Sequence, residues 1–109
     1  MKRGEIWTQS GGPSYAGKPR PVLIIQSDLL NGTESIITCL FTSIANENVP
    51  TRPRFMPDAG NGLRETSDLM VDKITTVARN KLGKRIGAVS AEDMERVEDA
   101  MLLVLGFAG

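Results

Sequence analysis

The chain has 109 residues, of which 40% are hydrophobic and 24% charged, so we expect residues 1–109 to fold as one soluble domain. It has no histidine and one cysteine, which excludes His/Cys zinc sites, histidine-based catalytic triads and an internal disulfide, and we expect neither a metal nor another cofactor. No apolar run reaches the roughly 18 residues of a membrane span, and the basic start is not followed by an apolar segment. We therefore expect no membrane segment, no signal peptide and a reducing, cytoplasmic location.

The net charge of zero is unevenly distributed along the chain. Residues 1–89 carry 12 basic and 8 acidic side chains, whereas residues 90–109 carry 1 basic and 5 acidic ones. A basic body would attract phosphate groups, and a chance asymmetry is the competing interpretation.

The first half of the chain predicts strands joined by one long loop. Residues 20–26 and 35–44 are apolar on both alternating faces, which is typical of strands buried on both sides. Cys39, inside the second of them, is interpreted as a small buried hydrophobe. The expected elements are a strand at 4–9, a mobile Gly/Pro-rich loop at 10–19, strands at 20–26 and 35–44, and one helical turn at 27–32.

The second half predicts further short strands. Pro50 and Pro53 hold residues 49–55 extended and suit an edge strand. The remaining expected elements are a turn at 57–62, strands at 67–72 and 73–79 with a break at Asp72–Lys73, and a short extended segment at 84–90.

The last element is an expected helix. Ser90 is a good N-cap, with Asp93 three residues on, and one apolar face is defined by Met94, Val97, Met101 and Val104. Residues 100–105 are apolar all round, so we expect cover from a partner subunit or from within the domain. Short strands followed by one helix predict a mainly β (α+β) small barrel or curled sheet, capped by that helix.

Arg20 stands between Pro19 and Pro21, directly ahead of an apolar strand. Each proline fixes its own φ and favours extended geometry in the residue before it. The backbone at Arg20 is therefore expected to be stiff, which a cation needed only for solubility does not require.

Six segments resemble, in order and almost end to end, the MazF/PemK family of toxin endoribonucleases: MKRGEIW, RPVLII, LFTSI, NVPTRPRF, DLMVDKITTVAR and GKRIGAVSAEDMERVEDAMLLVLG. The resemblance implies an SH3-like small barrel of the CcdB/MazF type that forms a homodimer. It also implies the toxin of a type II toxin–antitoxin system, which cleaves single-stranded RNA sequence-specifically without a metal. The implied partners are the RNA and a cognate antitoxin whose extended tail blocks the RNA groove.

The resemblance places the family's arginine at Arg20, its threonine at Thr42 and its acidic residue at Asp72, and these are the expected catalytic residues. Some relatives have an arginine two positions before the acid, where this chain has Met70, and a histidine in the first loop, which this chain lacks. Their acid–base pair therefore does not transfer intact, and the general base stays open.

The chemistry is consistent with these residue types. RNA carries its own nucleophile, the 2′-OH, whose attack would yield a 2′,3′-cyclic phosphate and a 5′-hydroxyl. The planar fork of Arg20 suits the charge that develops on the phosphate, and Thr42 would donate to another phosphate oxygen. Asp72 is the available carboxylate.

Further RNA contacts are expected from the first loop and from the ends of the strands that follow it. Tyr15 would stack on a base and Lys18 would meet a phosphate. The full set of expected RNA-binding residues is Tyr15, Lys18, Pro19, Ser43 and Arg54. Two alternatives stay open, a CcdB-type gyrase poison, disfavoured by the ending GFAG, and a non-catalytic SH3-like binding module.

Overall fold

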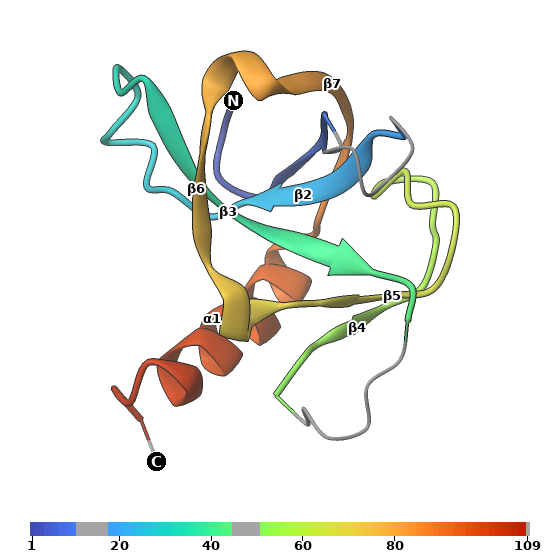
Figure 1. Ribbon diagram of the computed structural model, residues 1–109. Coiled ribbons are helices and arrows are strands. Elements are labelled where there is room, and N and C mark those ends of the chain that lie inside the picture. The colour runs from blue at the N-terminus through green and yellow to red at the C-terminus, as the bar shows by residue number, and fades with distance from the viewer. Residues whose placement is uncertain (11–17, 45–50, 109) are drawn as a thin grey trace.

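In the computed structural model, which describes residues 1–10, 18–44 and 51–108, the strands form one curled sheet and a single helix follows them (Figure 1). The elements of this described part are β1 (Glu5–Gln9), β2 (Arg20–Ile24), β3 (Ser35–Thr42), β4 (Arg54–Phe55), β5 (Ser67–Leu69), the 3-10 turn η2 (Val71–Lys73), β6 (Thr75–Ala78), the 3-10 turn η3 (Arg79–Lys81), β7 (Leu82–Ala88) and α1 (Ala91–Val104). The expected mainly β architecture with a C-terminal helix is confirmed.

The sheet has the order β4-β5-β3-β2-β1-β7, and β6 also pairs with β3. All pairings between the described strands are antiparallel. One long strand, β3, pairs with β6 along Ser35–Thr38 and with β5 along Phe41–Thr42, so η2 joins two strands on the same side of β3. The predicted break at Asp72–Lys73 is thereby confirmed, and β4 is an edge strand as Pro53 suggested.

The predicted helical turn over residues 27–32 is wrong. The segment contains two tight turns and no helix; in the first turn the backbone N–H of Leu30 donates to the carbonyl of Ser27 at 3.0 Å. The side chain of Gln26 donates to the carbonyl of Leu30 at 2.6 Å and to Oγ1 of Thr33 at 3.0 Å. Because Gln26 takes the Leu30 carbonyl, that carbonyl does not serve a continuing helix.

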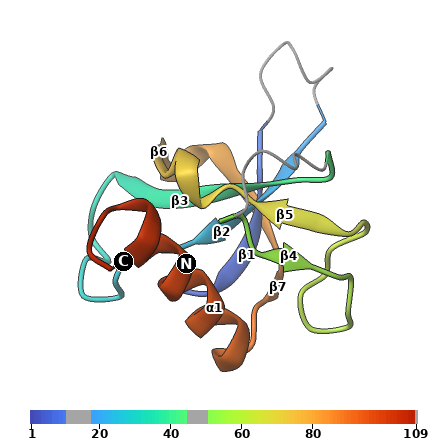
Figure 2. The ribbon, with the colours of Figure 1, turned by 90° about the horizontal axis from the view of Figure 1, so that it is seen from below.

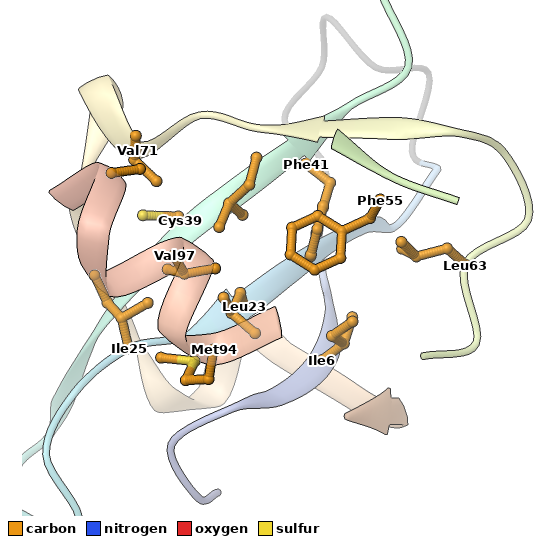
Figure 3. Close-up of a cluster of buried hydrophobic side chains, with 12 residues drawn as sticks. Ile6, Leu23, Ile25, Cys39, Phe41, Phe55, Leu63, Val71, Met94 and Val97 are labelled. Carbon is orange, nitrogen blue, oxygen red and sulfur yellow. The ribbon is translucent and has the colours of Figure 1, made fainter. Parts of the chain in front are cut away.

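Strand β2 is buried on both faces, as its sequence predicted. Leu23 and the adjoining Ile25 belong to the core cluster that α1 covers, whereas Val22 and Ile24 belong to a second cluster on the opposite face. Figure 3 shows the first cluster, where side chains from the sheet meet Met94 and Val97 of the helix. We call this side of the sheet the helix face and the other side the opposite face.

Helix α1 begins as predicted. Oγ of Ser90 accepts a hydrogen bond from the N–H of Asp93 at 3.0 Å, which satisfies one of the helix's free N-terminal donors. Arg96 fastens the helix to β4: its guanidinium lies 5.1 Å from the ring centroid of Phe55 and donates to the carbonyl of Arg54 at 2.8 Å. Figure 2 shows the helix along one side of the curled sheet.

The end of the helix is apolar and uncovered. Leu103 and Leu105 are 52% and 54% exposed, and Phe107 is 78% exposed. We expected this segment to be covered either by a partner subunit or by burial within the domain. These exposed side chains show that the domain itself does not cover it. No helix in the described ranges combines the length and apolar character needed to cross a membrane.

Candidate functional site

A pocket of about 780 Å³ opens where the start of β2, the end of β3 and the segment between β4 and β5 come together. Its walls are largely apolar, with contributions from Pro21, Phe41, Leu63 and Ile86. The polar and charged side chains that line it are Thr8, Lys18, Arg20, Ser43, Arg64, Glu65 and Ser67. Among the described residues, three cations and one carboxylate thus line one cavity, which favours a negatively charged ligand.

Arg20 is positioned by two different strands. Its backbone opens β2, where it stands opposite Gln9 of β1. Its half-buried side chain reaches across to β3, where Nη2 donates to the carbonyl of Phe41 at 3.4 Å. The guanidinium is therefore held at the edge of the pocket, as the flanking prolines suggested for the backbone.

The register of the sheet also brings Arg20 close to Thr42. Val22 pairs with Leu40, and continuing that antiparallel register by two residues in each strand sets Arg20 opposite Thr42. Thr42 in turn pairs with Asp68, and Asp68 pairs with Arg54. Because paired residues share a face, these four side chains form a row across β2, β3, β5 and β4 on the opposite face. We call them the polar row; Arg20 belongs to both this row and the pocket.

Thr42 is 9% exposed and lies between two residues that line the pocket, Phe41 and Ser43. Its Oγ1 accepts a hydrogen bond from the N–H of Ile44 at 3.2 Å. The hydroxyl hydrogen remains a donor, because a threonine hydroxyl carries one donor besides its acceptor sites. This geometry fixes the Thr42 side chain at the point where β3 ends.

Two carboxylates, one on β5 and one on η2, are engaged by arginines. Oδ1 of Asp68 accepts from Nε of Arg54 at 2.9 Å, and Oδ2 from Nη2 at 3.3 Å. Asp72, on η2, accepts in the same two-pronged way from Arg52, at 2.8 and 3.0 Å. The hydrogen bonding from Arg52 holds the pKa of Asp72 below its ordinary value, against the opposing effect of burial.

The structure brings together four of the eight residues expected from the sequence. Lys18, Pro19, Arg20 and Ser43 line the pocket. Three others lie apart from the lining: Thr42 beneath the end of β3, and Asp72 and Arg54 in their ion pairs. Tyr15 falls outside the residues that the structure describes.

Four polar residues of the pocket were not among those expected to act in catalysis or to contact RNA, namely Thr8, Arg64, Glu65 and Ser67. Glu65 is the carboxylate among the described lining residues, and it follows the predicted turn at 57–62 in the run RETS. In the sequence, Glu65 is marked by a cluster of charged and hydroxyl residues between a turn and a strand. The sequence does not show that this cluster lies beside β2 and β3, because those strands are distant along the chain.

A curled antiparallel sheet with a C-terminal helix over one face is also the fold of solved toxin structures. The chain superposes with a TM-score of 0.82 on an endoribonuclease in complex with its cognate antitoxin from a mycobacterial species, at 23% identity and with 100% of this chain and 98% of that one covered. The TM-score is 0.76 for a MazE–MazF structure from Deinococcus radiodurans, at 18% identity and with 97% and 95% covered.

The chain belongs to the PemK-like, MazF-like toxin family of type II toxin–antitoxin systems, whose sequence model matches residues 2–105. It is 43% identical over 109 residues to a probable endoribonuclease MazF from Mycolicibacterium smegmatis, with 100% of each chain covered. It is also 28% identical over 111 residues to endoribonuclease EndoA from Bacillus subtilis, with 96% of this chain and 94% of that one covered. The family resemblance expected from the sequence motifs is thereby confirmed.

Proposed function

We propose that this protein is the toxin of a type II toxin–antitoxin system and cleaves single-stranded RNA sequence-specifically and without a metal. The observation that carries the proposal is the position of Arg20, held by β2 and β3 where the polar row meets a cationic pocket. Residues 1–109 act as one domain, and the site of action is the cytoplasm.

Arg20 stabilises the scissile phosphate as it becomes more negative. The 2′-OH gives up its proton and attacks the neighbouring phosphorus, and the bond from phosphorus to the 5′-oxygen breaks. The 5′-oxygen takes up a proton from water, so the products are a 2′,3′-cyclic phosphate and a 5′-hydroxyl. A guanidinium offers two parallel donors to phosphate oxygens, and a donor already held in place needs no reorganisation during the reaction. Thr42, its neighbour in the polar row, donates its hydroxyl hydrogen to another phosphate oxygen.

Asp72 is the proposed proton acceptor for the 2′-OH. Arg52 occupies one lone pair on each of its oxygens, and an ionised carboxylate offers about four such positions. Asp72 therefore retains acceptor capacity, and its side chain is 28% exposed. Its lowered pKa makes it a weak base, so Asp72→Asn is expected to lower kcat about 100-fold, at the low end for loss of a general base. An unchanged kcat would move the proton transfer to another group.

The proposed partners are a cognate antitoxin, whose extended tail occupies the RNA groove, and a second copy of the chain. Support for the homodimer comes from the apolar end of α1, where Leu102, Leu103, Leu105 and Phe107 are 44% to 78% exposed. Symmetric pairing is the commonest way to cover such a surface. Light scattering at micromolar concentration should give twice the monomer mass; a monomer would contradict this part of the proposal.

The reaction is tested by incubating the pure protein with a long RNA in EDTA and mapping the new 5′ ends by primer extension. We expect cleavage at one short sequence, with 5′ ends that accept phosphate from polynucleotide kinase without prior dephosphorylation. Arg20→Ala serves as the control for a contaminating nuclease. Cleavage that stops in EDTA and returns with Mg²⁺ would refute the mechanism, and no cleavage in either buffer would refute the activity.

A further inference from the structure

Glu65 differs from the other carboxylates near the site. Asp68 and Asp72 each accept two hydrogen bonds from an arginine, whereas Glu65 forms no ion pair with any described residue. Glu65 is one of the residues that line the pocket, together with Arg20 and Arg64. The two oxygens of Glu65 are thus open to donors carried by a ligand.

The segment that carries Glu65 is anchored by a compact network of side chains immediately before it. Oδ1 of Asp58 accepts from the N–H groups of Gly60 and Asn61, at 2.8 and 2.7 Å. Asn61, only 3% exposed, accepts through Oδ1 from the N–H of Leu63 at 3.0 Å and donates through Nδ2 to the carbonyl of Met56 at 2.9 Å. These bonds fix the backbone two residues before Glu65.

The same segment is seated on β7. The N–H of Ala88 donates to the carbonyl of Gly60 at 2.9 Å. At Gly87 the two backbones approach so closely that an added Cβ would lie 2.4 Å from the carbonyl carbon of Asn61. Gly62 has a φ of +69°, and its own Cβ would lie 2.1 Å from the carbonyl oxygen of Ile86. Glu65 is therefore presented from a base fixed against the sheet, as a residue that selects a ligand requires.

The chemistry of the pocket matches one nucleotide. The apolar walls suit the faces of a base, and the cations at Lys18, Arg20 and Arg64 suit its phosphates. A carboxylate accepts hydrogen bonds and donates none, so it selects bases by their N–H groups. Guanine presents two adjacent donors, and adenine and cytosine present an amino group, whereas the single N–H of uracil is flanked by two carbonyls that repel a carboxylate.

We propose that this pocket binds the base of a nucleotide adjoining the scissile phosphate, and that Glu65 determines its identity by accepting hydrogen bonds from an amino-bearing base, guanine best, and by rejecting uracil. This inference rests on the proposed ribonuclease function. Arg20 connects base binding with RNA cleavage, because it lines the pocket and also belongs to the polar row, where we propose that the phosphate reacts.

The test is to cleave a pool of randomised single-stranded RNA with the wild type and with Glu65→Gln, and to sequence the new 5′-hydroxyl ends. Wild type should discriminate against uracil at one position beside the cut by roughly 5- to 100-fold, the range for one good base contact. Glu65→Gln should lose most of that discrimination and still cleave, because an amide can donate to uracil as well as accept. Glu65→Asp, which keeps the carboxylate, should retain it.

Glu95→Gln is the matched control, since Glu95 is exposed on α1 and does not line the pocket. It should leave the preference unchanged. If wild type cleaves and Glu65→Gln keeps the same preference at every position, the assignment of Glu65 is wrong while the ribonuclease function stands. If Glu65→Gln changed only the affinity for an antitoxin peptide, the pocket would be a protein-binding site and the assignment of Glu65 would equally be wrong. A wild type that cleaves no RNA would remove the proposed function and this inference together.

Discussion

Gly87→Ala tests how tightly the segment between β4 and β5 packs against β7. The added Cβ would lie 2.4 Å from both the carbonyl carbon and the carbonyl oxygen of Asn61, and 2.5 Å from the carbonyl oxygen of Gly60. Ordinary van der Waals contact begins at 3.4 Å, so the segment must retreat by the difference between 3.4 and 2.4 Å. Such a movement stretches the 2.9 Å hydrogen bond from Ala88 to Gly60 beyond useful length.

The expected cost follows from these two effects. Overpacking against backbone that cannot move freely costs about 1–3 kcal/mol, and the lost hydrogen bond costs about 0.5–1.5 kcal/mol. Gly87→Ala should therefore lower the free energy of unfolding by about 2–4 kcal/mol, which corresponds to a fall in Tm of roughly 10–20 °C for a domain of this size. Because the same segment presents Glu65, the variant should also discriminate less well against uracil.

Urea denaturation followed by circular dichroism measures the change. Gly32→Ala is the control, because nothing lies within 4 Å of a Cβ added there, and its stability should stay within about 0.5 kcal/mol of wild type. A Gly87→Ala variant that unfolds at the same urea concentration as wild type would show that β7 and the segment are not in close contact in solution. The rigid presentation of Glu65 would then lose its basis.

Three further changes probe the site and the core. Arg20→Ala should lower kcat about 10²- to 10³-fold and should lower the affinity for uncleaved RNA much less. Arg20→Lys should rescue kcat in part, because an ammonium keeps the charge and loses the planar fork of donors. An equally steep loss of affinity would make Arg20 a binding residue instead. The fold lowers the pKa of Asp72, so its ion pair with Arg52 stabilises the protein at pH values above 3.8, the ordinary pKa of Asp. This stabilisation is lost as the pH falls through the lowered pKa of the folded protein. Asp72→Asn should accordingly cost about 1–2 kcal/mol near neutral pH and converge with wild type in acid, as denaturation at a series of pH values would reveal; a difference that persists in acid would contradict the ion-pair account. Burial, together with the negative charge of Asp72, raises the pKa of the fully buried Cys39 thiol to about 12. A thiol reagent should therefore label Cys39 only at the rate of global unfolding. Rapid labelling of the native protein would contradict the place of Cys39 in the core.

The elements were predictable because their signals are local. The apolar run of β2 needs no partner to be recognised, and neither does the pairing of Ser90 with Asp93 at the start of α1. The turn at 27–30 was not predictable, since the side chain that redirects it, Gln26, was taken as the last residue of a strand. Its contact with the Leu30 carbonyl competes with the helical hydrogen bond that the local pattern suggested.

The site was predictable only in part, because its members come from distant segments. Arg20 stands out in the sequence through Pro19 and Pro21, which restrict it locally. Glu65 is marked only by the charged and hydroxyl residues around it, and no proline restricts it locally. Its proposed role arises when the segment after β4 folds back onto β7 and faces the start of β2. The pairing of Asp72 with Arg52 likewise joins residues 20 positions apart, and it turns a carboxylate expected to be free into one half of an ion pair.

The charge asymmetry of the sequence has a local meaning in the fold. The basic residues of the body do not act as a uniform field, since several described arginines are paired with carboxylates, namely Arg3 with Glu98, Arg52 with Asp72, Arg54 with Asp68 and Arg85 with Glu5. The described residues that line the pocket include the cations Lys18, Arg20 and Arg64 and one carboxylate, Glu65. These cations favour phosphate at the place where Arg20 is fixed. Because cations outnumber the carboxylate among these described residues, Glu65 repels little of the RNA backbone while it accepts hydrogen bonds from the base.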